Sequence, residues 1–113
     1  MKLARFALLG TLFFTATSFA EPLPVPLSKI AYIGNWQGKD MQLKISPNGK
    51  IFYKRTTQEK QFNLNIELSS FDGDNFDAGV GIINSTFHVT KPPTKSGDKI
   101  TMIVDGVELT KAN

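Results

Sequence analysis

Apolar and polar residues alternate along most of the chain from Ile30 onward. Met41, Leu43 and Ile45, for example, are separated by single polar residues. Successive side chains of a β-strand point to opposite faces of a sheet, so a period of two predicts strands with one buried face. No stretch after the first twenty residues repeats its apolar positions with the 3.6-residue period of a helix. The pattern predicts an all-β protein without helices.

Three turn signals agree with the hydrophobic pattern around them. Pro47-Asn48-Gly49 suits a three-residue hairpin loop that sets Ile45 opposite Ile51. Lys39-Asp40 and Asp105-Gly106 suit two-residue turns, the second of type I′. Turn chemistry and period therefore predict the same registers. The further expected pairs are Trp36 with Leu43, Leu43 with Tyr53, Val104 with Val107 and Met102 with Leu109.

Three more features are expected in the middle of the chain. The inward parity changes between Leu68 and Phe71, which predicts a β-bulge at Ser69-Ser70. Asp72-Gly73-Asp74-Asn75 suits a four-residue loop, and Asn84-Ser85 suits a tight turn. The second of these turns would pair Ile82 with Phe87 and Val80 with Val89.

The expected fold is a small antiparallel meander of about eight strands, each joined to the next by a hairpin. Such a meander either closes into an up-and-down barrel or folds into a β-sandwich. We favour a closed or nearly closed barrel, because closure removes exposed strand edges. A chain without cysteine cannot protect such edges with disulfide bonds. Large apolar side chains are expected to fill it and leave little room for an internal ligand. The expected inward residues are Trp36, Met41, Leu43, Ile45, Ile51, Tyr53, Phe62, Leu64, Ile66, Leu68, Phe71, Phe76, Val80, Ile82, Phe87, Val89, Ile100, Met102, Val104, Val107 and Leu109.

The first twenty residues differ from the rest. They hold Lys2 and Arg5, then an apolar run, then small residues up to Ala20, which is the composition of a secretory signal peptide cleaved after Ala20. We therefore expect a periplasmic or secreted protein with no membrane span. Residues 21–28 are rich in proline and are expected to form an extended arm, followed by a single β-domain over residues 29–113.

Composition excludes several kinds of function. Without Lys2 and Arg5 the chain carries eleven basic and ten acidic residues, a net charge of +1, which does not suit nucleic-acid binding. Because cysteine is absent, the protein has no disulfide, thiolate metal site or cysteine nucleophile. The single histidine, His88, lies between two inward positions, so we expect it to face solvent and bind no metal. No cofactor is expected.

No catalytic motif is present. The serines lack a Gly-x-Ser-x-Gly setting and share one histidine. The loop that begins at Asp72 lacks the glycine and glutamate of a calcium loop. A carboxylate pair for glycoside hydrolysis stays open because its spacing is spatial, but a filled small barrel offers no deep cleft. We therefore expect a protein that is not an enzyme.

Charge is unevenly distributed. Residues 39–60 carry a net charge of +4 and residues 65–83 a net charge of −4. In the first hairpin Phe52 faces outward opposite Lys44, with Lys54 beside it. A basic surface with an exposed aromatic ring suits an acidic envelope protein, glycan or lipid head group. The alternative is a solvated sheet face whose lysines suppress edge pairing.

Two resemblances accompany these patterns. Gly34-Asn35-Trp36 on the first strand resembles the Gly-x-Trp signature of lipocalins, in which the tryptophan packs at the closed end of the barrel. Four longer segments are Tyr32-x-Gly34-x-Trp36-x-Gly38, Gly73-Asp74-x-Phe76-x-x-Gly79-Val80-Gly81, Lys91-Pro92-Pro93 and Met102-x-Val104-Asp105-Gly106-Val107-Glu108-Leu109-Thr110. Together they resemble a group of small exported proteins of Gram-negative bacteria. That resemblance implies an envelope location and supplies no activity.

The sequence leaves three functions open. The first is a non-enzymatic binding or interaction module of the bacterial cell envelope, with Lys44, Phe52 and Lys54 as the candidate partner-binding residues. The second is a periplasmic inhibitor of a protease or lysozyme, on the analogy that small exported barrels suit an inhibitor. The third is a carrier of a small apolar ligand.

Overall fold

The computed structural model describes residues 24–112. The expected signal peptide and the first residues of the expected proline-rich arm lie outside the described residues. A short 3-10 helix, η2 (Leu27–Tyr32), is followed by nine strands. The strands are β1 (Gly34–Gly38), β2 (Met41–Ile45), β3 (Lys50–Thr56), β4 (Gln61–Asp72), β5 (Asn75–Val80), β6 (Ile83–Phe87), β7 (Val89–Ser96), β8 (Lys99–Val104) and β9 (Val107–Lys111).

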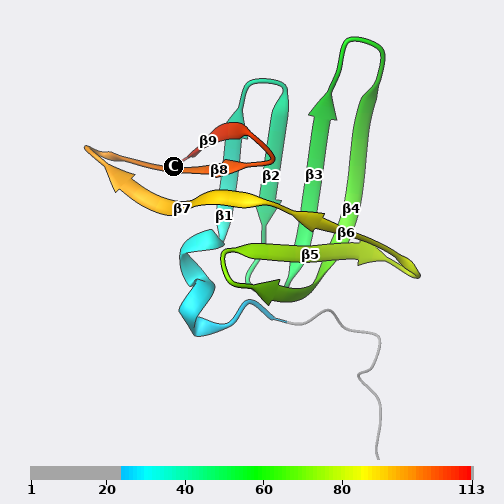
Figure 1. Ribbon diagram of the computed structural model, residues 1–113, viewed down its shortest axis with the longest axis horizontal. Coiled ribbons are helices and arrows are strands. Elements are labelled where there is room, and N and C mark those ends of the chain that lie inside the picture. The colour runs from blue at the N-terminus through cyan, green and yellow to red at the C-terminus, as the bar shows by residue number, and fades with distance from the viewer. Residues whose placement is uncertain (1–23, 113) are drawn as a thin grey trace, which may run out of the picture.

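All nine strands belong to one antiparallel sheet, in the order β6-β5-β4-β3-β2-β1-β9-β8-β7. In Figure 1, β1 to β4 lie roughly vertical, in alternating directions, and β5 to β8 cross them. The sheet curls into a half-barrel, and the core lies between its two crossing parts. The predicted all-β antiparallel meander is confirmed.

The two edge strands of this sheet, β6 and β7, are consecutive in the chain. They lie end to end with only His88 between them (Figure 1). β6 pairs with β5, whereas β7 pairs with β8. One extended segment therefore supplies both edges and draws the half-barrel together.

Most of the predicted hairpin registers are confirmed. Trp36 lies opposite Leu43, and Ile45 lies opposite Ile51. Asp105 and Gly106 both have positive φ, as a type I′ turn requires. The register of β4 shifts between Leu68 and Ser70, at the predicted bulge.

The predicted turn at Asn84-Ser85 is wrong. The chain reverses at Gly81-Ile82, where Gly81 has a φ of 63°. Glycine at the first central position suits a type II′ turn, so this dipeptide reverses the chain more readily than Asn84-Ser85, which lies within β6. The pairs observed are Val80 with Ile83, Phe76 with Phe87 and Val89 with Val104. The loop before β5 is also tighter than expected, because Asp72 pairs with Asn75.

The expectation of a chain without helices is wrong for η2, which is too short to display a helical period. Leu27 and Ser28, assigned to the extended arm, belong to this helix. The ring of Tyr32 packs edge-on against Phe71, with 5.1 Å between the ring centroids, and its hydroxyl donates to the backbone oxygen of Asp74 at 2.9 Å. Burial, assisted by the nearby carboxylate of Asp74, raises the pKa of Tyr32 to about 12. These contacts dock η2 on the turn between β4 and β5.

The core contains most of the residues expected there. Thirteen are buried, namely Trp36, Met41, Leu43, Ile45, Ile51, Ile66, Leu68, Phe76, Phe87, Val89, Met102, Val104 and Leu109. Tyr53, Phe71, Ile100 and Val107 are half-buried against them. The expectation is wrong for Phe62, Leu64, Val80 and Ile82, which are exposed. Tyr32 and Ala78 are buried but were not expected to be.

Trp36 is a core residue, as its position beside two glycines indicates. Its indole Nε1 donates to the backbone oxygen of Tyr32 at 2.9 Å. The Nζ atom of Lys111 lies 5.0 Å from the centre of the ring, and burial lowers the pKa of this lysine. A Cβ atom at Gly38 would overlap the backbone oxygen of Glu108, so glycine lets β9 approach β1 here.

Candidate binding site

Exposed apolar side chains gather on one part of the molecule. In the described part of the chain, seven large apolar residues are exposed, and five of them lie on β4 or on the β5–β6 hairpin. These five are Phe62, Leu64, Val80, Ile82 and Ile83. Scattered apolar residues are ordinary on a protein surface, but a contiguous group indicates a place where something binds.

A groove of about 420 Å³ lies within this region, which we call the apolar groove. Most of its lining comes from the inward faces of the four strands β3 to β6, and Asp105 of the turn between β8 and β9 completes it. The apolar members of the lining are Tyr53, Leu64, Ile66, Ala78, Val80, Ile83 and Phe87. The expectation that side chains fill the interior fails at this groove.

Aromatic rings form the inner end of the groove. Tyr53 and Phe87 meet edge to face with their centroids 5.3 Å apart, and Phe87 stacks on Phe76 at 4.9 Å. Phe76 is buried in the core, so this wall rests on closely packed core side chains. The apolar groove is therefore largely preformed.

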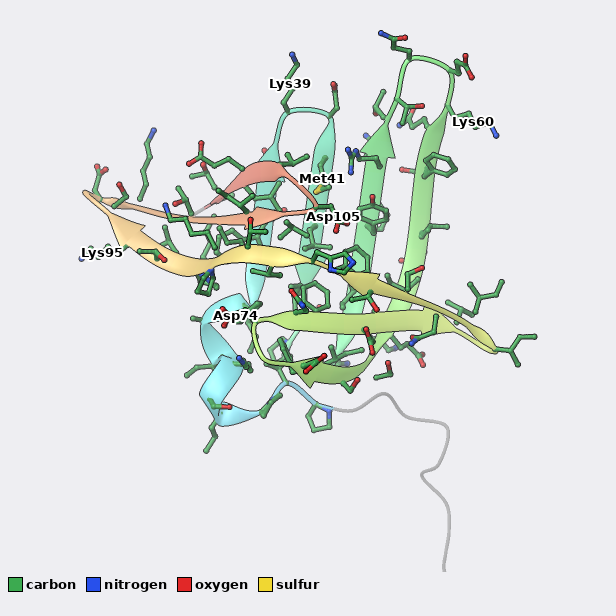
Figure 2. All side chains as sticks on the ribbon, viewed as in Figure 1. Lys39, Met41, Lys60, Asp74, Lys95 and Asp105 are labelled. Atoms are coloured by element: carbon green, nitrogen blue, oxygen red, sulfur yellow. The ribbon has the colours of Figure 1, made fainter. Side chains whose placement is uncertain are left out.

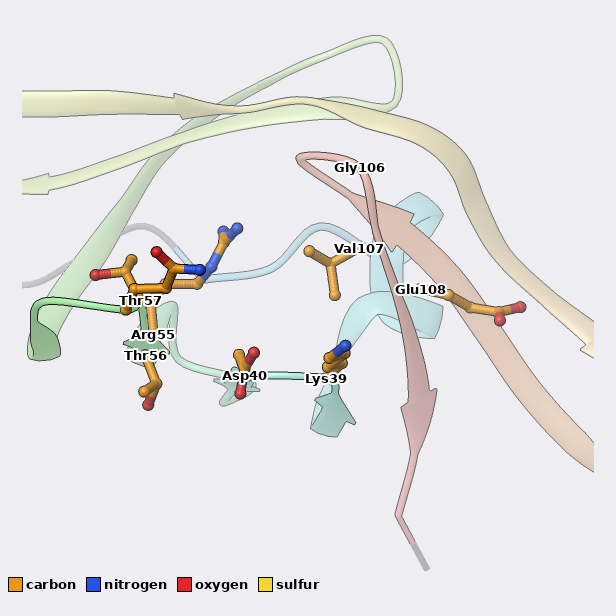
Figure 3. A pocket seen from close by; sticks show the side chains of 9 residues that line it. Lys39, Asp40, Arg55, Thr56, Thr57, Gly106, Val107 and Glu108 are labelled. Atoms are coloured by element: carbon orange, nitrogen blue, oxygen red, sulfur yellow. The ribbon is translucent and has the colours of Figure 1, made fainter.

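The groove adjoins a second, more polar pocket of about 700 Å³ (Figure 3). Arg55 follows Tyr53 as the next inward residue of β3, and Gly106 follows Asp105 in the turn before β9. Tyr53 and Asp105 line the groove, whereas Arg55 and Gly106 line the polar pocket. The two hollows therefore lie next to each other, the groove mainly apolar and the second pocket more polar.

Arg55 is one of four charged residues that line the polar pocket, the others being Lys39, Asp40 and Glu108. Figure 3 shows the Arg55 side chain rising from the end of β3 toward the turn at Gly106. Within residues 24–112 the ion pair present joins Lys29 to Asp74, so no carboxylate of the described chain lies within 4.0 Å of the Arg55 guanidinium. Sequence reasoning missed Arg55, although it continues the inward period of Ile51 and Tyr53. Such a guanidinium is a ready donor to an anion.

The sequence-predicted partner-binding residues lie on the opposite, outer face of the sheet. Phe52 is opposite Lys44, and Lys54 is opposite Gln42, as expected. Phe52 is half-buried rather than fully exposed. A shallow depression of about 420 Å³ contains Lys44 and Phe52, but Lys54 is not part of its lining. The structure therefore brings two of the three residues together.

Other candidate chemistry is sparse in the described chain. His88 is exposed, as expected, and lies at the junction of β6 and β7. Between residues 24 and 112 no three acidic or histidine side chains gather as a metal site would need. No helix in the same residues has the length and apolar run that a membrane crossing needs. Figure 2 shows the distribution of all described side chains on the ribbon.

Comparison of the chain with protein-family models, with curated proteins and with solved structures finds no match.

Proposed function

We propose that this protein is a non-enzymatic binding module that takes a small apolar ligand with an anionic end into the mouth of the half-barrel. The observation that carries the proposal is the apolar groove beside an inward arginine without an ion-pair partner in the described chain. The composition of residues 1–20 further leads us to locate the module in the bacterial cell envelope.

The apolar part of the ligand would contact Leu64, Ile66 and Ala78 and rest against the aromatic wall. Removing apolar surface from water contributes about 25 cal/mol per Å², and it favours burial of the ligand and of the exposed Leu64 together. A groove that is preformed by core residues loses little entropy on binding. Affinity would therefore come mainly from the apolar groove.

The anionic end would lie at Arg55. Arginine donates two parallel hydrogen bonds to a carboxylate, which orients the ligand as well as holding it. The groove itself offers little for catalysis, because its titratable lining residues are Tyr53 and Asp105. Asp105 already accepts the backbone N–H of His88 through its Oδ1 atom at 2.9 Å. This arrangement supports binding rather than acid–base chemistry.

Calorimetric titration of the secreted protein with decanoate tests the proposal. We expect one decanoate per chain, with a negative change in heat capacity from apolar burial. Leu64→Asn should weaken binding about tenfold or more, and Arg55→Gln about 10- to 100-fold, since a hydrogen bond to a charged group contributes about 1.5–3 kcal/mol. Lys54→Gln, a cation one residue away on the outer face, is the control. Absence of binding, or an equal loss in the control, would contradict the proposal.

A second candidate function rests on the outer depression that contains Lys44 and Phe52. A half-buried ring beside cations can anchor an acidic envelope protein, glycan or lipid head group. The hydrolase-inhibitor alternative predicts that the protein retains a protease or lysozyme from periplasmic extract. A pull-down with wild-type protein and with Phe52→Ala tests both ideas.

A further inference from the structure

Besides the outer sides of the edge strands β6 and β7, a stretch of β4 also has no strand beside it in the described chain. β4 pairs with β3 over residues 61–67, but its pairing with β5 begins only at Glu67. From Gln61 to Ile66, the other side of β4 therefore has no strand partner within the described chain. This edge continues past the end of the β5–β6 hairpin, and backbone donors and acceptors are available along it.

The sequence of this edge does nothing to prevent pairing. Residues 61–66 contain no charge, no proline and no glycine, and Phe62, Leu64 and Ile66 alternate with Asn63 and Asn65. Uncharged segments of this composition readily add a further strand. The edge at β7 is different, because Lys91, Pro92, Pro93 and Lys95 lie on it and two register shifts distort it. The fold protects that edge and leaves the β4 edge open.

The exposed apolar side chains lie at the same place. Phe62 and Leu64 are 41% and 44% exposed on the inward face of this part of β4. The tip of the β5–β6 hairpin projects past β4 in Figure 1 and carries Ile82, which is fully exposed, and Ile83. Exposed isoleucines at the hairpin tip, close to exposed Phe62 and Leu64, form an apolar patch of the kind that marks an interaction surface.

We propose that two copies of this chain form a dimer by antiparallel pairing of their β4 edges over residues 62–66, with Leu64 of one copy opposite Leu64 of the other. A two-fold axis perpendicular to the sheet keeps the inward side of one copy on the inward side of the other. Apolar inward residues then lie opposite apolar inward residues, and Asn63 and Asn65 meet on the outer side. Each projecting hairpin tip extends over the neighbouring copy and covers its Phe62, which is not part of the lining of the apolar groove.

A second copy is the occupant that these observations favour. The uncharged edge meets no like-charge repulsion when it pairs with itself. Each chain also carries both halves of the apolar contact, the uncovered β4 side chains and the uncovered hairpin tip. The dimer does not require the ligand proposed above, so its existence can be tested on ligand-free protein.

Sedimentation equilibrium of the ligand-free secreted protein tests the dimer. We expect the mass of two chains at high concentration and dissociation toward one chain on dilution. Ile82→Asp should raise the dissociation constant at least about tenfold, because two carboxylates would then be buried on β4 side chains. The residue is fully exposed in a single copy, so this substitution leaves the fold intact.

Leu27→Asp is the matched control, because Leu27 is 87% exposed on η2, away from the β4 edge. This control should dimerise like the wild-type protein. Hydrogen exchange of the amides in residues 62–66 should slow as protein concentration rises, whereas exchange in η2 should not change. A single-chain mass at millimolar concentration, or a dimer that Leu27→Asp dissociates and Ile82→Asp does not, would overturn the proposal.

Discussion

Asn75 holds the first residue of β7 in place, since its side-chain Oδ1 atom accepts the backbone N–H of Val89 at 2.8 Å. Asn75 begins β5, and Val89 begins the strand at the far edge of the sheet. A second link across the same junction joins His88 and Asp105, whose backbone N–H donates to the His88 oxygen at 2.8 Å. At this junction β5 and β7 are not paired as strands, and these two hydrogen bonds hold the parts of the half-barrel together.

Replacing Asn75 by alanine should therefore destabilise the protein. The buried N–H of Val89 would lose its acceptor, and an unsatisfied buried donor costs about 1–3 kcal/mol. Urea denaturation should show a decrease of this size in the free energy of unfolding. Asn63→Ala, on the exposed outer side of β4, should change it by less than about 0.5 kcal/mol. Equal effects of the two substitutions would mean that the Asn75 contact does not hold the junction.

Stability should fall as the pH rises from about 10 to about 12. The pKa of Tyr32 in the folded protein is about 12, above the ordinary value of 10.0, so the unfolded chain releases this proton first. The stabilisation is complete below pH 10 and is lost as the pH rises through the folded pKa. Denaturation midpoints across this range measure the effect, and Tyr32→Phe should remove it. A tyrosinate absorbance titration in which Tyr32, identified by comparison with Tyr32→Phe, ionises near pH 10 would contradict it.

Gly38→Ala should weaken the pairing of β1 with β9. The added methyl group overlaps the backbone oxygen of Glu108, and neither strand can shift without disturbing Trp36 or Leu109 in the core. Overpacking of this kind costs about 1–3 kcal/mol. The neighbouring exposed residue provides the control, since Gln37→Ala should leave the thermal midpoint nearly unchanged.

Phe52→Ala separates a binding role on the outer face from a structural one. The ring is half-buried on the side away from the core, so its loss should reduce stability by less than about 1 kcal/mol. Partners retained from periplasmic extract should be lost if the outer depression binds them. Unfolding of the variant would show that the ring is structural, and unchanged retention would show that this face is only solvated.

The hairpins that sequence patterns predicted correctly have turn residues suited to their geometry. Asp40 and Asp105 adopt positive φ, and Gly49 has a φ of 90° in its loop. In each case the inward period on both sides of the turn supports the same register. At Asn84-Ser85 the sequence prediction fails because Gly81 adopts positive φ without strain and reverses the chain three residues earlier.

The exposed groove could not be predicted from a period of two. Alternation identifies which face of a strand points inward, but it does not tell whether another layer covers that face. Phe62 and Leu64 have the correct parity and remain exposed because β4 extends beyond the strands that cross it. Arg55 was overlooked because an inward position was equated with an apolar residue. The sequence thus predicts which residues face the groove. It does not predict that no further layer covers them.

The pairing of the first strand with the last affects how the protein folds. Lys111 and its neighbours on β9 pair with β1 beside Trp36. The core around Trp36 is therefore complete only when nearly the whole chain is present. Contacts so distant in sequence slow folding, because a long loop must close before they form. A chain that emerges from its N-terminus first can form the hairpins of β1 to β5 early, with their apolar faces still bare. Until β9 is made, these uncovered apolar faces expose the growing chain to aggregation.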